Sequence, residues 1–143
     1  MEAKAVFISL PSSSPTFWVG QLHSEALTLG LRPYIYRGIS TCPDPQISNV
    51  ECEARSDLYA VDRVFVLMTP RHDNELDGEW IIKYLSKLLE RGIVCDVGIV
   101  ATEVKCAVHH PRIPREARFK QFGAFEQWIA HLRTELNSIA SAG

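Results

Sequence analysis

Residues 4–30 read "KAVFISLPSSSPTFWVGQLHSEALTLG" and predict a strand, a loop and a helix in succession. Residues 5–9 form a short apolar run rich in strand-forming side chains. In residues 17–29 the apolar side chains recur at helical spacing, and Gly30 follows where a helix C-cap is expected. A strand that feeds a helix in this way is the first half of a β-α-β unit.

The same alternation continues to the end of the chain. Further strands are predicted at residues 33–36, 63–68, 93–100 and, as a short edge strand, 117–121. Further helices are predicted at residues 47–61, after an N-cap at Asp77, and at 122–139. The helix after Asp77 carries a clear apolar stripe, made of Trp80, Ile81, Tyr84, Leu85, Leu88 and Leu89.

Strands that alternate with helices predict a parallel sheet covered on both faces. Right-handed crossovers then limit the order of the strands. We predict a single domain over residues 1–143 with a flavodoxin-like, three-layer α/β/α fold. The sheet is expected to have four or five parallel strands, in the order of about 2-1-3-4-5.

Composition excludes several classes of protein. The 143 residues are 46% hydrophobic and 22% charged, with a formal net charge of −2, which is ordinary for a globular domain and gives no reason to expect a nucleic-acid partner. No apolar run approaches the ~20 residues of a membrane-spanning helix, and the N-terminus does not resemble a signal peptide. We therefore expect a cytoplasmic protein.

The cysteines favour free thiols over disulfides or zinc. None of the four forms a C-x-x-C pair. Cys106 lies near His109 and His110, but no matching ligand pair occurs elsewhere. We expect neither a bound metal nor a cofactor.

The candidate site follows from the predicted topology. In a doubly wound sheet, ligands bind outside the carboxyl ends of the strands, where the strand order reverses. The loops at residues 9–16, 37–46 and 69–78 share this edge. The serines of the first loop are interpreted either as a connector, with an N-cap at Ser14 or Thr16, or as a ligand contact at the start of a helix.

Glu79 is the candidate catalytic carboxylate, because it opens a helix beside Trp80 at the mouth of this crevice. The alternative is that it is acidic only because the first turn of a helix favours negative charge. The predicted substrate-binding residues are Phe7, Ser9, Ser12, Arg37, Trp80 and Tyr84. The sequence contains neither a dinucleotide-binding nor a Walker fingerprint.

Four segments together resemble a TIR domain, within the wider group of TIR and nucleoside deoxyribosyltransferase-like domains. They read "AVFIS", "YRGISTCPDPQISNVECEARSDLYAVDRVFVLMTP", "ELDGEWIIKYL" and "PRIPREARFKQFGAFEQWIAHLRTEL". The resemblance implies cleavage of the bond between ribose and nicotinamide in NAD, which would be a substrate and not a cofactor. It also implies self-association with like domains and a role in defence, stress or innate immune signalling.

One position departs from the catalytic TIR pattern. The family uses a glutamate four residues after its tryptophan, and this chain has Tyr84 there. Deoxyribosyltransferase-like enzymes resemble the chain at "DGEW", which implies that Glu79 acts on the sugar with support from Asp77. Three readings stay open: an N-glycosidase acting on NAD or a related nucleotide, an interaction module that docks through the loop at 37–46, and a nucleotide sensor without turnover.

Overall fold

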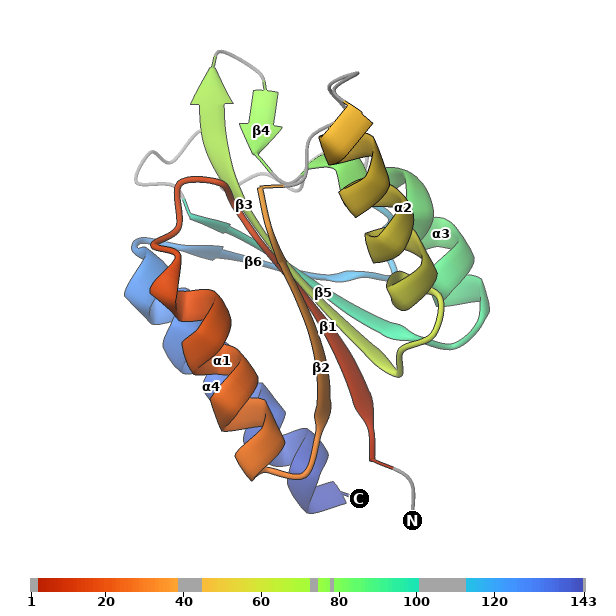
Figure 1. Cartoon of the computed structure of the whole chain (residues 1–143), viewed down its shortest axis with the longest axis vertical. Coiled ribbons are helices and arrows are strands. Elements are labelled where there is room, and N and C mark those ends of the chain that lie inside the picture. Colours follow the sequence, from red (N-terminus) through yellow and green to blue (C-terminus); the bar gives the residue numbers. More distant parts are fainter. Residues whose placement is uncertain (1–2, 39–44, 73–74, 78, 101–112, 143) are drawn as a thin grey trace.

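The computed structural model describes residues 3–38, 45–72, 75–77, 79–100 and 113–142. Its strands are β1 (Ala5–Leu10), β2 (Arg32–Arg37), β3 (Arg63–His72), β4 (Glu75–Asp77), β5 (Val94–Val100) and β6 (Arg118–Phe122). Its helices are α1 (Phe17–Thr28), α2 (Pro45–Leu58), the 3-10 turn η1 (Glu79–Ile81), α3 (Ile82–Glu90) and α4 (Phe125–Ala142). Figure 1 shows the sheet as a twisted central layer between two pairs of helices.

The five long strands are parallel and follow the order β2-β1-β3-β5-β6. This confirms the predicted flavodoxin-like fold and the order 2-1-3-4-5, counting the parallel strands along the chain. The chain runs from β1 outward to β2 and then returns to place β3 on the other side of β1. The strand order therefore reverses between β1 and β3, where such folds open a crevice for ligands.

The alternation of side chains along β1 divides the interior into two cores. Val6, Ile8 and Leu10 pack with buried residues of α1 and α4. Ala5 and Phe7 face the opposite way, into the core beneath α2 and α3. All six residues of β1 are buried, because helices cover both faces of the sheet (Figure 1).

The segment after β3 differs from the prediction. β3 continues to His72 and pairs with the short antiparallel strand β4, with a register shift between Pro70 and His72. Asp77 ends β4 and is not the N-cap of the next helix, so that prediction is wrong. The chain instead enters α3 through η1, and Ile81 occupies the N-cap position without a side-chain capping bond. Short 3-10 turns commonly lead into α-helices in this way.

The last helix also begins later than predicted. Phe122 belongs to β6 and pairs with Val100 of β5, so the predicted start of the helix at this residue is wrong. Gly123 follows the strand, and Gln127 in the first turn of α4 accepts a hydrogen bond from the Gly123 backbone N–H at 2.9 Å. This contact closes the strand-to-helix corner from the helix side.

Candidate functional site

Four aromatic rings line up on the face of the sheet beneath α2 and α3. Phe7 of β1 stacks on Tyr36 of β2, with ring centroids 5.4 Å apart. On its other side Phe7 meets Trp80 of η1 edge to face at 6.2 Å, and Trp80 meets Tyr84 of α3 at 6.0 Å. We call Phe7, Tyr36, Trp80 and Tyr84 the aromatic wall. It joins β1, β2, η1 and α3, which are distant along the chain.

The aromatic wall is buried at its centre and partly accessible at its ends. Phe7 is fully buried and Trp80 is 5% exposed, whereas Tyr36 and Tyr84 are half-buried. The indole Nε1 of Trp80 is buried and has no hydrogen-bond partner in the part of the chain that the structure describes. A buried donor without a partner is unfavourable, so this nitrogen is an unusual feature of the aromatic wall.

Tyr36 brings a carboxylate to the aromatic wall. Its hydroxyl donates a hydrogen bond to Oδ2 of Asp57 on α2. Burial and then this bond raise the pKa of the Tyr36 phenol above its ordinary value. The phenol therefore stays protonated at neutral pH and serves as a donor rather than as a base.

The serine loop after β1 is held in place by Arg37, the last residue of β2. The Arg37 guanidinium donates to the backbone oxygen of Ser12 at 2.5 Å and to that of Ser14 at 3.3 Å. Gly38 adopts a φ of +70°, and a Cβ added there would lie 3.1 Å from the Cβ of Ser12. The close passage of the two loops therefore suits a glycine at this position.

The N-cap predicted in that loop is confirmed by position and not by a side-chain bond. Thr16 occupies the N-cap position of α1, but its side chain makes no capping hydrogen bond. The hydroxyl of Ser14 is buried and lacks a partner among the described residues. Ser9, on β1, is also buried. The loop is thus anchored from β2 through its backbone and not by a serine cap.

The backbone of Glu79 opens η1 immediately before Trp80, so the predicted catalytic residue lies next to the aromatic wall in the chain. The side chains of Glu79 and Asp77 lie outside the described part of the structure, as do the whole residues 39–44 and 73–74. Tyr84 contacts both Trp80 and Tyr59, the residue that follows α2, with the ring centroids of Tyr84 and Tyr59 6.1 Å apart. The ligand-binding roles predicted for these residues stay predictions.

Sequence reasoning missed two residues at this site, Tyr36 and Asp57. Tyr34 and Tyr36 alternate in β2, which places both rings on the α2 side, and this period-two pattern was the available signal. The pairing of Tyr36 with Asp57 joins residues 21 positions apart and leaves no local pattern in the sequence. The site therefore contains a phenol–carboxylate pair beside the predicted aromatic residues.

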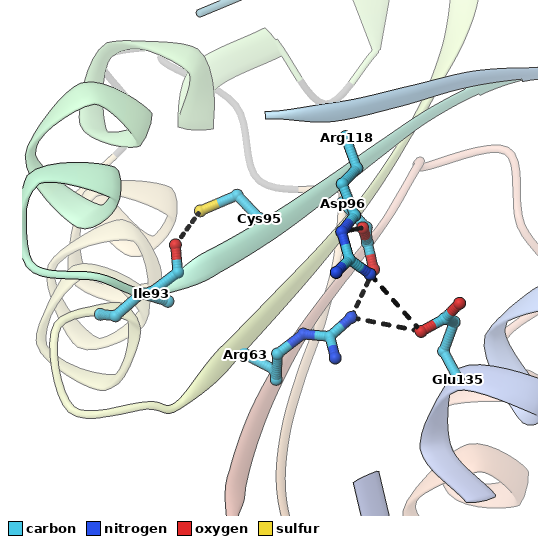
Figure 2. A network of polar contacts seen from close by, with 6 residues as sticks. All are labelled: Arg63, Ile93, Cys95, Asp96, Arg118 and Glu135. Carbon is cyan, nitrogen blue, oxygen red and sulfur yellow. Dashed lines mark hydrogen bonds and ion pairs between the residues drawn. The ribbon is translucent and has the colours of Figure 1, made fainter. Parts of the chain in front are cut away.

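A second polar cluster lies on the opposite face of the sheet. Arg63 at the start of β3 donates to Asp96 of β5 at 2.6 Å and to Glu135 of α4 at 3.4 Å (Figure 2). Arg118 of β6 approaches the same two carboxylates at 3.9 and 4.0 Å. These ion pairs fasten α4 to three strands near their amino ends, away from the edge at which ligands bind.

No group of three or more potential metal ligands occurs among the described residues, and Cys106, His109 and His110 lie outside them. No helix in the described part of the chain is long and apolar enough to cross a membrane.

Comparison with known proteins gives a match in structure only. No protein-family model matches the chain. No curated protein matches its sequence. A 2-desoxiribosyltransferase from Leishmania mexicana is similar in structure, with a TM-score of 0.52 and 15% sequence identity over 92% of this chain and 97% of that one. At this identity the similarity establishes the shared fold.

Proposed function

We propose that the protein cleaves or transfers the N-glycosidic bond of a nucleoside or nucleotide, with Glu79 as the catalytic carboxylate. The observation that carries the proposal is the contact between Trp80 and Phe7 at 6.2 Å. This contact supports the proposal because η1, whose backbone begins at Glu79, lies against β1, next to the point where the strand order reverses. The deoxyribosyltransferase with the same fold supports this substrate class.

The chemistry requires few groups. Departure of the base leaves positive charge on the sugar, and a nearby carboxylate either stabilises this charge or forms a covalent bond to the anomeric carbon. The accessible parts of Tyr36 and Tyr84 offer surfaces on which a base can stack. The unpartnered Nε1 of Trp80 supplies a donor to the ligand, and the hydroxyl oxygen of Tyr36, whose proton is bonded to Asp57, supplies an acceptor.

NAD is one substrate of this class, and the resemblance to TIR domains extends the proposal to it and to a role in defence or stress signalling. The reaction would then release nicotinamide. Ribonucleosides, deoxyribonucleosides and their monophosphates are the other candidates, and each would release a free base or exchange it for another. The assay should therefore follow bases and nicotinamide together by chromatography.

The test is the substitution Glu79→Gln, which keeps the size of the side chain and removes its charge. We expect the release of base from the best substrate to fall by at least about 100-fold, as for the loss of a group that stabilises charge in the transition state. Glu90→Gln is the matched control, because Glu90 is exposed at the far end of α3, the helix that follows η1. Unchanged turnover in the Glu79 variant would remove this residue from the mechanism.

A nucleotide sensor or interaction module without turnover is the second candidate, and Tyr84 favours it. This residue stands where catalytic TIR domains have a glutamate, and its ring packs between Trp80 and Tyr59. A sensor would show a thermal shift with NAD or another nucleotide but release no product. Light scattering at several protein concentrations, with and without NAD, would detect self-association and distinguish an interaction module from a sensor.

A further inference from the structure

A hollow of about 180 Å³ lies on the side of the sheet that α4 covers, between this helix and strands β5 and β6. Gly98 and Trp128 form its inner wall, and Arg118, Lys120 and His131 supply its basic side chains. We call these five residues the basic hollow. Asp96 also lines it.

Strand register explains why the three basic side chains converge. Gly98 of β5 pairs with Lys120 of β6, and Asp96 pairs with Arg118, two residues earlier on both strands. Because side chains alternate along a strand, Arg118 and Lys120 project to the same face. His131 reaches this face from α4 and packs against Phe122, with ring centroids 5.3 Å apart.

Gly98 keeps the inner wall open. A Cβ added at this residue would lie 2.8 Å from Cδ1 and 3.0 Å from Nε1 of Trp128. The edge of the indole that carries its N–H therefore lies directly against the strand. Trp128 is 2% exposed and cannot move aside without disturbing the core. The inner wall of the hollow is therefore rigid.

The basic side chains around the hollow make only long ion pairs, or none, with carboxylates of the described residues. Arg118 is 61% exposed in its side chain, and its contacts to Asp96 and Glu135 are as long as 3.9 and 4.0 Å. Lys120 lies 5.4 Å from the ring of Phe122. In the described residues, neither Lys120 nor His131 forms an ion pair with a carboxylate.

The carboxylate in the wall does not cancel this positive charge. Asp96 is held by Arg63 at 2.6 Å (Figure 2). Arg63 belongs to β3, which lies on the opposite side of β5 from β6, the strand that carries Lys120. Together the network and the hollow hold three fixed positive charges, on Arg63, Arg118 and Lys120, against two negative ones, on Asp96 and Glu135. The excess of one positive charge favours the binding of an anion here.

We propose that the basic hollow binds a tetrahedral oxyanion, either free orthophosphate or the phosphoryl group of a small metabolite. Its volume is well below the ~300 Å³ of pockets that enclose whole organic ligands, so a single anionic group fits and a nucleoside does not. The guanidinium of Arg118 and the ammonium of Lys120 contact the anion. The site lies on the opposite sheet face from the aromatic wall and is independent of the proposed function.

The test is a titration with inorganic phosphate at constant ionic strength, followed by two-dimensional NMR. We expect saturable shifts at the backbone N–H of Gly98 and the indole N–H of Trp128. The variant Lys120→Gln should weaken binding by about tenfold, as for the loss of a charge-assisted hydrogen bond. Lys87→Gln is the matched control, because Lys87 is exposed on α3 across the sheet and does not line the hollow.

Two further probes identify the ligand. Ribose 5-phosphate that binds more tightly than orthophosphate assigns the site to phosphorylated metabolites, and equal affinities assign it to the free ion. Acetate that binds as tightly as phosphate would overturn the preference for a tetrahedral anion. Absence of saturable shifts at Gly98 and Trp128, or equal phosphate affinity in the Lys120 and Lys87 variants, would overturn the site itself.

Discussion

Gly98 and Trp128 meet so closely that no other residue fits at position 98 without displacement. An added Cβ would lie 2.8 Å from the indole of Trp128 and 3.0 Å from the ring of Phe122. Both aromatic residues are buried, and they belong to the core beneath α1 and α4. The contact lets α4 approach β5 closely over the middle of the strand.

We therefore expect Gly98→Ala to lower the free energy of unfolding by about 1–3 kcal/mol, as for other substitutions that overpack a core. Urea denaturation followed by tryptophan fluorescence measures the change. Gly20→Ala is the matched control, since Gly20 is exposed within α1 and a Cβ there meets nothing within 4 Å. The control should be more stable than the parent by about 0.5–1 kcal/mol. Equal effects of the two substitutions would contradict the close contact.

The ion pair between Arg63 and Asp96 should stabilise the protein measurably. The two side chains are only 15% and 11% exposed, and their atoms approach to 2.6 Å. Asp96→Ala leaves the Arg63 guanidinium largely buried, with Glu135 at 3.4 Å as a remaining partner. We expect the free energy of unfolding to fall by about 2 kcal/mol, below the 3–5 kcal/mol of a fully buried pair.

The control for this loss is Glu116→Ala, which removes an exposed carboxylate and should change stability by less than about 0.5 kcal/mol. A double-mutant cycle with Arg63→Gln separates the pair from the individual side chains. If Asp96→Ala were as stable as Glu116→Ala, the close ion pair would not exist in solution.

The fold could be predicted because the buried strands are recognisable in the sequence. β1 and the first part of β3 are continuous apolar runs, and helical stripes separate them from the other strands. β4 and η1 were not predicted, because each has only three residues, too few to show the hydrophobic periodicity of a strand or a helix. Phe122 and Phe125 are equally apolar, so only the pairing of Phe122 with Val100 reveals where the strand ends.

The sequence predicts which residues of the candidate site lie near the carboxyl ends of the strands. It does not predict the contacts between residues that are far apart in the sequence. Phe7 and Trp80 were both expected at the crevice, and the structure brings them into contact. The bonds from Arg37 to the backbone of the serine loop join positions that are 25 and 23 residues apart. Such contacts follow from the three-dimensional arrangement of the loops, and no local spacing of residues encodes them.

Two cysteines should differ sharply in reactivity. Burial, and then the nearby charge of Asp96, raise the pKa of the Cys95 thiol to about 12, whereas Cys52 is exposed on α2. Because the thiolate is the reactive form, a maleimide at pH 7.5 should label Cys52 in the folded protein and leave Cys95 unlabelled. Peptide mass spectrometry separates these thiols from Cys42 and Cys106. Denaturation in urea should make Cys95 as reactive as Cys52, and equal labelling in the native state would contradict its burial.

The same thiol should make the protein less stable in alkali. The pKa of Cys95 is about 12 in the folded protein, against about 8.5 for a free thiol, so the unfolded chain loses this proton first as the pH rises. The folded state then binds more protons than the unfolded state, and the free energy of unfolding falls between about pH 9 and pH 12 while it is unaffected by this group below that range. Urea denaturation at pH 7 to 10.5 measures the slope. Cys95→Ala should make the free energy of unfolding less dependent on pH in this range, whatever the effect of the substitution on stability at pH 7. Cys52→Ala, the same substitution at an exposed position, should leave the pH dependence unchanged. A slope unchanged in the Cys95 variant would show that other groups govern the alkaline transition.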